Sequence, residues 1–335
     1  MDTFVDSSWY YARYLSPDDA AQPFDAGAAR QWFPVDVYVG GPEHAVMHLL
    51  YFRFWHRVMR LLGLVLEDEP VRRLITQGIV NGPDGRKMSK RWGNVVAPGP
   101  IVARFGADTL RLFILFAAPP EKNIDWSDEQ VEGLHRFVAR VWRLFHGRQH
   151  CFSAPELGAA APPAMAPELL ELRRRTHRTI KRVTEGFEGD LKFNTGIAAL
   201  MELLNAIGAV EPRSEGDRAA VREALVVLAT LLAPFAPHVA EELWHELAGD
   251  AAHDQLLAET PWPSFDPALV AADVVPIAVQ VNGKLRGEVQ TPVEADEAEV
   301  RALAEGEPRV RAYLDGKTVR KVVFVPRRLI NFVVG

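Results

Sequence analysis

The spacing of hydrophobic residues changes twice along this 335-residue chain, and those changes limit the folds available to it. Up to residue 118, short β-branched runs alternate with helix-like segments, which is typical of an α/β unit with a parallel sheet. From 119 to 268 the spacing is helical, and from 274 it takes the period of two that strands show. The chain is therefore predicted to be multidomain, with an α/β segment over 1–118, an all-α segment over 119–268 and an α+β segment over 274–335.

The first segment contains two predicted strands and two predicted helices. One strand covers 35–39 and ends at Gly40-Gly41, and a helix over 44–62 follows it, with Gly63 as its terminating residue. A second strand is predicted over 74–80, turn-forming residues over 81–85, and a second helix over 101–116. Two strands are too few for a whole doubly wound sheet, so this segment is expected to be part of one.

The other two segments have clear boundaries. Five helices with short connections predict a helical bundle; the first follows a capping box formed by Ser127 and Gln130, and the others cover 168–187, 195–209, 217–232 and 237–248. Residues 152–167 are predicted to form a loop. In the last segment, strands over 277–281 and 285–289 flank Asn282-Gly283, the strongest two-residue hairpin signal. A helix over 295–305 and a strand over 319–325 complete it.

Composition excludes several classes of protein. No run of about 18 apolar residues predicts a membrane helix, and the first residues lack the pattern of a signal peptide. One cysteine, Cys151, forms neither an internal disulfide nor a cysteine-based zinc site, so a cytoplasmic protein is expected. The net charge of −6 does not indicate a nucleic-acid binder.

That total hides a local excess of positive charge near the end of the chain. From residue 309 onward, a group of basic residues is opposed only by Asp315; its members are Arg309, Arg311, Lys317, Arg320, Lys321, Arg327 and Arg328. Such a cluster is a candidate surface for phosphate contacts. A second cluster, with members Arg173, Arg174, Arg175, Arg178, Lys181 and Arg182, is either a similar surface or a solvated helix face paired with acids.

The run Lys87-Met88-Ser89-Lys90 follows a predicted strand and is flanked by glycines. Two lysines three residues apart can place positive charge on a polyphosphate, and a loop suits cations needed while charge develops in a transition state. The run is not a P-loop, because the G-x-x-x-x-G-K-[ST] pattern is absent. On charge alone, a solvated basic turn explains it as well.

The segment from Gly40 to His48 is a second candidate site. The glycine pair lets a ligand approach the backbone at the end of a strand, where open α/β sheets bind ligands. His44 and His48, four residues apart, are expected on one helix face, where they line a pocket, bind zinc, or simply lie on the surface. Residues 2–11 mix aromatic and small polar side chains, as do both pocket walls and ordinary core turns.

The order of these motifs carries a resemblance that none has alone. The strings DTFVDSSWYYARY, PVDVYVGGPEHAVMHLLYFRFWH, KMSK, FNTGIAALMELLN, LLAPFAPHVAEELW and VQVNGKLRG, in this order, resemble bacterial leucyl-tRNA synthetase, a class Ia aminoacyl-tRNA synthetase. The likeness extends over essentially the whole chain. It implies a partial Rossmann-type catalytic domain, a class Ia helical anticodon-binding bundle and a small C-terminal α+β domain that contacts tRNA.

The resemblance also implies roles for particular residues. It implies a leucine pocket formed by Phe4, Ser7, Tyr10, His44 and His48, and an ATP site formed by Gly40, Gly41, Glu43, Lys87, Met88, Ser89 and Lys90. Lys87 and Lys90 would be catalytic, stabilising the pyrophosphate that leaves as leucyl-adenylate forms. The implied substrates are leucine, ATP with Mg²⁺ and tRNA-Leu, with no structural metal and no membrane.

Three departures from the family pattern affect this expectation. The family's His-Ile-Gly-His motif does not occur in this chain, Arg91 replaces a serine of the signature loop, and the leucine-specific insertion before Lys87 is absent. The chain is therefore expected to need an N-terminal synthetase half, as a separate chain, for activity. Two alternatives are a non-catalytic tRNA-binding module or truncated relic, and a class Ia synthetase for valine, isoleucine or methionine; the GGPEHAVMH and VNGKLRG strings argue against the second.

Overall fold

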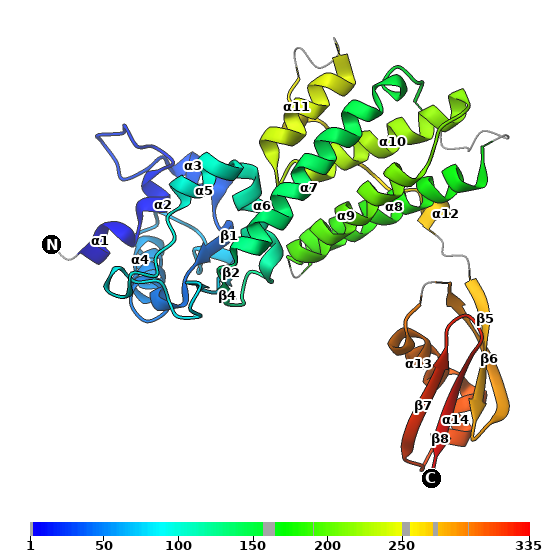
Figure 1. Ribbon diagram of the computed structural model, residues 1–335. Coiled ribbons are helices and arrows are strands. Elements are labelled where there is room, and N and C mark those ends of the chain that lie inside the picture. Colours follow the sequence, from blue (N-terminus) through cyan, green and yellow to red (C-terminus); the bar gives the residue numbers. More distant parts are fainter. Residues whose placement is uncertain (1–2, 157–164, 190, 250–254, 271–273, 294) are drawn as a thin grey trace. The chain divides into compact units, whose positions relative to one another are not determined.

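The computed structural model describes residues 3–156, 165–189, 191–249, 255–270, 274–293 and 295–335. They divide into two compact units, Met1–Ser264 and Phe265–Gly335. The first unit begins with a small α/β region (Figure 1). Its elements in chain order are α1 (Thr3–Ser7), α2 (Tyr10–Arg13), α3 (Ala26–Trp32), β1 (Val35–Gly40), η1 (Pro42–His44), α4 (His48–Leu61), β2 (Val71–Thr76), β3 (Val80–Asn81), η2 (Lys90–Trp92), α5 (Pro98–Phe105), α6 (Ala107–Ala117) and β4 (Ile124–Asp125).

The strands of this region form two small parallel sheets. β1 pairs with β2, and β3 pairs with β4. The single strand predicted over 74–80 is therefore wrong: β2 starts earlier and ends at Thr76, and the chain then turns into a different sheet. Gly78 lies at this turn, where its N–H donates to the carbonyl of Pro120 and any side chain would collide with the backbone of Lys122. That close approach is a long-range contact, which the local pattern does not contain.

Two predicted helices of this region also differ in the structure. The helix expected over 44–62 begins only at His48, because Pro42 to His44 form a separate 3-10 turn; its end agrees, with Gly63 at φ 74° following it. The helix expected over 101–116 is two helices, α5 and α6. They are separated at Gly106, whose φ of 86° is a conformation that favours glycine.

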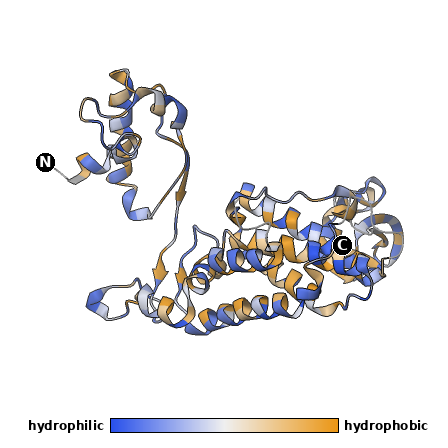
Figure 2. Cartoon of the chain, turned by 90° about the horizontal axis from the view of Figure 1, so that it is seen from above, coloured by the Kyte–Doolittle hydropathy of each residue, from blue (hydrophilic) through white to orange (hydrophobic). Residues whose placement is uncertain are grey.

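The predicted bundle helices are present in the first unit. They are α7 (Asp128–Gly147), α8 (Pro167–Glu188), α9 (Phe193–Ala209), α10 (Glu215–Leu232) and α11 (Pro237–Ala248), with short turns η3 (Gln149–Cys151) and η5 (Leu257–Glu259). Ser127 caps α7 by accepting from the backbone N–H of Gln130. Figure 2 shows the hydrophobic and hydrophilic faces of these helices; the hydrophobic faces bury residues such as Leu200, Leu225 and Leu228. Half of the loop predicted over 152–167, residues 157–164, lies outside the described residues, and α8 begins at Pro167.

The second unit is a four-stranded sheet in the order β6-β5-β8-β7, with helices on one face. Its elements are α12 (Pro267–Val270), β5 (Val274–Val281), β6 (Lys284–Pro292), α13 (Glu297–Gly306), α14 (Pro308–Leu314), β7 (Val319–Val325) and β8 (Leu329–Val334). The hairpin at Asn282-Gly283 is confirmed, with both residues at positive φ. α14 and β8 were not predicted. β8 pairs in parallel with β5 across the sheet and supplies the buried Ile330 and Phe332.

A buried histidine gives the first unit a pH-dependent stability. His56 is fully buried; its Nδ1 lies 2.7 Å from the Tyr11 hydroxyl and its Nε2 lies 3.1 Å from the carbonyl of Glu67. Since the carbonyl only accepts, Nε2 carries the proton and the tyrosine hydroxyl donates to Nδ1. Burial lowers the pKa of His56 below its usual 6.5, so a proton added there costs both hydration and the tyrosine bond.

We expect the free energy of unfolding to fall as pH drops below about 6.5. In the unfolded chain this histidine keeps the higher pKa, so below about pH 6.5 the unfolded chain binds more protons than the folded one. The stabilisation from His56 is therefore complete above that pH and is lost below it. Carboxyl groups whose pKa is lowered in the folded chain change the free energy of unfolding only at lower pH. In the unfolded chain their pKa values lie near 4. Urea unfolding at pH 7.5, 6.5 and 5.5 measures the effect, and His56→Gln is expected to flatten it. Equal slopes in both proteins would contradict this assignment.

Candidate active site

A cavity of about 600 Å³ lies in the α/β region of the first unit, at the C-terminal end of β1. Parallel strands present their carboxyl ends at one edge, where such sheets bind ligands. The cavity is lined by Phe4, Ser7, Tyr10, Tyr38, Val39, Gly40, Gly41, His44, His48, Leu49, Leu74, Thr76 and Gln77. It thus brings together all five residues of the expected leucine pocket and both glycines of the expected ATP site.

Five elements position these side chains. α1 and α2 supply Phe4, Ser7 and Tyr10, while β1 supplies the two-glycine end. His44 lies on η1 and His48 is the first residue of α4, so the expectation that they share one helix face is wrong. Their rings nevertheless meet edge to face, with centroids 5.9 Å apart. The 3-10 turn therefore achieves the proximity that the predicted helix was expected to give.

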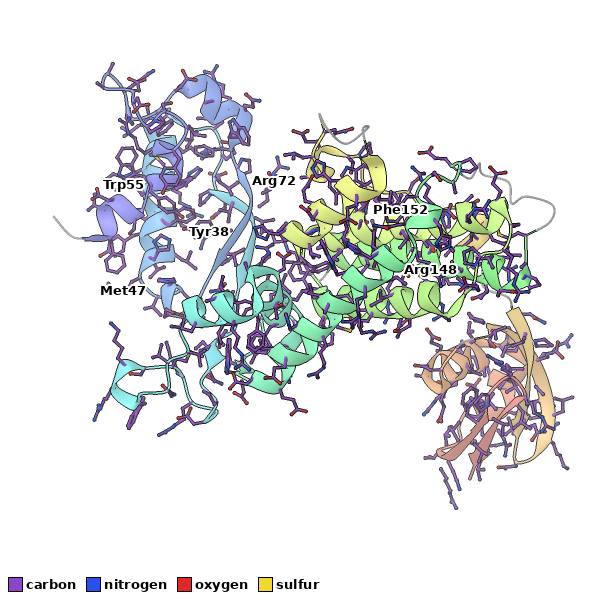
Figure 3. The ribbon with its side chains drawn as sticks, turned by 45° about the horizontal axis from the view of Figure 1, so that its top comes forward. Tyr38, Met47, Trp55, Arg72, Arg148 and Phe152 are labelled. Carbon is purple, nitrogen blue, oxygen red and sulfur yellow. The ribbon has the colours of Figure 1, made fainter. Side chains whose placement is uncertain are left out.

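A chain of hydrogen bonds crosses the cavity wall through Tyr38. The hydroxyls of Tyr10 and Tyr38 lie 2.8 Å apart, and the Tyr38 hydroxyl lies 2.8 Å from Nε2 of His48. Tyr38 extends from β1 toward α4, where its ring stacks on Phe52 at 4.8 Å (Figure 3). The sequence interpretation missed this residue. The sequence did contain an indication of its role. Side chains of a strand alternate between its two faces, so Tyr38 lies on the same face as Gly40, two residues later.

Two titratable groups of the cavity wall, His48 and Tyr38, are held in their uncharged forms. Burial, together with the neighbouring His44, lowers the pKa of His48, so the imidazole is uncharged. Burial and the hydrogen bond with Tyr10 raise the pKa of Tyr38. A wall of aromatic rings and neutral imidazole, with an apolar contribution from Leu49 and Leu74, suits an uncharged, branched aliphatic group.

The loop with the two lysines follows β3. Lys87 and Lys90 are exposed and are not among the residues that line the cavity. Neither forms an ion pair within the described part of the chain. Met88 and Ser89 are half-buried, and the Ser89 hydroxyl accepts from the N–H of Arg91 at the start of η2. Glu43 is exposed on η1 and also lies outside the cavity lining.

One asparagine fixes the shape of this loop. The Asn94 side chain accepts from the N–H of Ser89 at 2.9 Å and donates to Asp84 at 3.0 Å and toward the carbonyls of Arg86 and Lys87. The Asn94 bond and those from Arg86 lower the pKa of Asp84 to about 2. The loop is therefore held at its base while its lysines remain in solvent.

The residue that departs from the family pattern has a local partner. The guanidinium groups of Arg86 and Arg91 lie 5.1 and 5.2 Å from the centre of the Trp92 ring, which is itself exposed. These distances are within the range of a cation–π contact. Arg91 is thus accommodated by the ring next to it.

The two basic clusters differ in their surroundings. The seven basic residues that begin at Arg309 are all exposed in the second unit, on α14, on β7 and in the turns after each. In α8, by contrast, Arg173 is only 2% exposed and is bound to Glu223 through two hydrogen bonds of 2.8 and 3.2 Å. Although burial raises it, bonds from His177 and Arg173 hold the pKa of Glu223 below its usual value.

Four other members of the α8 cluster are also paired. Arg174 and Arg178 lie near Glu171, Lys181 near Glu185, and Arg182 near Glu202. This arrangement favours an ion-paired helix face over a phosphate-binding surface for this cluster. Across the described residues, no three His, Cys, Asp or Glu side chains gather as metal ligands do. No helix in the same residues is long and apolar enough to cross a membrane.

Comparison with known proteins places the chain in a class. The family described as tRNA synthetases class I (I, L, M and V) matches residues 1–127, and the anticodon-binding domain of tRNA ligase matches residues 170–301. The chain therefore resembles class I tRNA synthetases in both of these segments. A methionyl-tRNA synthetase from Mycobacterium tuberculosis, 20% identical, shares the fold over 79% of this chain and 54% of its own, with a TM-score of 0.54.

The similarity is higher to one member of that class. Leucine–tRNA ligases from Geobacter sp. (strain M21) and Thermotoga maritima are 50% and 45% identical over this whole chain. The crystal structure of a ternary complex of Agrobacterium radiobacter K84 LeuRS with tRNA and LeuAMS matches all of this chain and 42% of that chain, with 38% identity and a TM-score of 0.76. The chain is similar to leucine–tRNA ligases over its whole length, and it spans about 40% of the length of these curated relatives.

Proposed function

We propose that this chain provides the leucine pocket, the pyrophosphate-binding lysines and a tRNA-binding surface of a leucine–tRNA ligase. The observation that supports this most directly is the cavity at the end of β1, where Phe4, Ser7, Tyr10, His44 and His48 lie together. The leucine side chain would occupy this cavity. Its largely apolar wall suits an aliphatic group, and the open space at Gly40 leaves room for the adenosine of ATP, with Gly41, Glu43 and the Met88-Ser89 pair beside it.

The reaction has two steps. The leucine carboxylate attacks the α-phosphorus of ATP, the bond to the β-phosphate breaks, and pyrophosphate leaves to give leucyl-adenylate. A ribose hydroxyl at the 3′ end of tRNA-Leu then attacks the leucyl carbonyl, and AMP leaves. Lys87 and Lys90 would counter the charge that develops on pyrophosphate, with Mg²⁺ bound to the ATP phosphates. Moving the loop would bring these lysines to the substrate.

Each of the three segments of the chain has a proposed role in this enzyme. Residues 1–118 would form the second half of the catalytic domain, 119–268 the anticodon-binding-type bundle, and 274–335 the domain that contacts tRNA through the basic residues from Arg309 onward. The remaining contacts to ATP and to the leucine amino group would come from a segment that the longer relatives contain. The cytoplasm, where ATP and tRNA meet, is the proposed location.

Leucine-dependent ATP–pyrophosphate exchange tests this function. The purified chain alone is expected to show none, because half of the nucleotide site is missing from it. Adding the complementary part of the Geobacter sp. (strain M21) ligase, the part this chain does not match, is expected to produce exchange. Robust exchange by the chain alone would refute the need for a second half, and no exchange from the reconstituted pair would refute the proposed activity.

A further inference from the structure

An exposed aromatic ring lies on the loop that carries Lys87 and Lys90. Trp92 is the last residue of η2 and is 54% exposed. Its backbone is nevertheless fixed, because its N–H donates to the carbonyl of Ser89 at 3.0 Å and Gly93, at φ 64°, ends the turn directly after it. Single exposed apolar side chains are common on proteins, so the groups around this ring decide whether it binds a ligand.

The groups around the ring are basic. The guanidinium carbons of Arg86 and Arg91 lie 5.1 and 5.2 Å from its centre, and the two lysines of the loop are exposed beside them. Asp84 forms an ion pair with Arg86 at 2.8 Å and neutralises one of these four cations. Arg91 forms no ion pair with the described residues, so its charge is available to a ligand together with that of the lysines.

An exposed ring among cations has the chemistry of a site for single-stranded nucleic acid. The flat face of an unpaired base stacks on an aromatic side chain, while the phosphates on either side of that base bind nearby cations. A base inside a double helix is already covered on both faces by its neighbours, so it is not available for such stacking. Arginine adds to this preference, because its planar guanidinium also stacks on bases.

We propose that Trp92, with Arg86 and Arg91, is a stacking site for an unpaired nucleotide at the 3′ end of tRNA. This inference rests on the proposed function, in which that end must reach the leucyl group close to the lysine loop. ATP also has a base and phosphates, but its adenosine is assigned to the space at Gly40 and its phosphates to the lysines, which leaves Trp92 and the arginines unoccupied. Arg91 stands where the family pattern has a serine, so the site belongs to this chain and not to the pattern.

Removing the ring tests the stacking. Trp92→Ala in the full chain is expected to weaken binding of tRNA-Leu about tenfold in a filter-binding assay, whereas Trp92→Tyr, which keeps a ring, should restore most of the affinity. Trp32→Ala is the matched control, because it removes a similarly exposed tryptophan, 64% exposed, from α3 of the same unit. Since Trp92 is exposed, the thermal unfolding of its variants should match that of the wild-type chain.

A shortened RNA and a salt series identify which part of the tRNA the ring contacts and how. The wild-type chain is expected to bind tRNA-Leu without its unpaired 3′ nucleotides about tenfold more weakly, and Trp92→Ala should weaken that binding no further. The ring is uncharged, so Trp92→Ala should leave the slope of log K against log salt unchanged. Arg91→Ala should reduce this slope by about 0.7, the value for one phosphate contact on a single strand.

The outcomes separate this site from the proposed activity. Wild-type affinity of Trp92→Ala for the complete tRNA would overturn the stacking site, even if the reconstituted pair catalyses exchange. An equal loss with the shortened tRNA would overturn it too, as would a raised KM for ATP with unchanged tRNA binding, which would assign the ring to ATP. Weakened binding of the complete tRNA alone, in a pair that catalyses no leucine-dependent exchange, would support the site and refute the proposed function.

Discussion

Lys87→Ala and Lys90→Ala are each expected to slow leucyl-adenylate formation by about 100- to 1000-fold in the reconstituted enzyme, the range for losing one preorganised charge-stabilising group. Both ammonium groups extend into solvent from a loop held by Asn94, so their charge is available to a ligand. Since the negative charge on pyrophosphate grows in the transition state, the loss should fall mainly on kcat and less on the KM for leucine.

Pyrophosphate exchange over a range of leucine concentrations measures both constants. Lys122→Ala removes an exposed lysine of the same unit, outside the proposed site, and should leave them near the wild-type values. A loss of less than tenfold in both loop variants would contradict the catalytic assignment and would favour the interpretation of this loop as a solvated basic turn.

Arg327→Ala with Arg328→Ala is expected to weaken binding of tRNA-Leu and to flatten its salt dependence. Removing one side chain that neutralises a phosphate should reduce the slope of log K against log salt by about 0.7 to 0.9, so removing two should reduce it by about 1.4 to 1.8. Arg327 has a φ of 61°, and alanine meets the same backbone cost there as arginine, so the comparison isolates the side chains.

Filter binding to the full chain between about 50 and 200 mM salt, an interval over which phosphate contacts change affinity strongly, gives this slope. Arg301→Ala is the control, because Arg301 lies in the same unit but is paired with Glu305 at 2.7 Å. An unchanged slope in the double variant would remove these two residues from the tRNA surface.

Local patterns predicted the elements that local interactions determine. The four bundle helices with predicted bounds lie within two residues of them, and the Asn282-Gly283 hairpin forms as expected, because apolar spacing, caps and turn residues act over a few positions. The errors lie where distant segments meet. The chain breaks after Thr76 because Gly78 approaches Lys122, and β8 is a strand because β5 and β7 bind its two edges.

The residues of the candidate site also fall into those that the sequence predicted and those that depend on contacts between distant segments. Resemblance to the family was enough to predict Phe4, Ser7, Tyr10, His44 and His48, and they share one cavity. Tyr38 was missed, because its importance comes from two hydrogen bonds to residues 28 and 10 positions away. The lysine loop was found by its motif, but whether its charge reaches the substrate depends on a movement, which neither the motif nor a single structure contains.

The amino acid that drives pyrophosphate exchange in the reconstituted enzyme tests the central claim, that the cavity at the end of β1 selects leucine. An apolar pocket discriminates between side chains that differ by one methylene by about 10- to 200-fold. We therefore expect leucine to give a kcat/KM at least tenfold above that for isoleucine, valine or methionine. A higher value for any of these three would contradict the claim and assign the cavity to another member of the class.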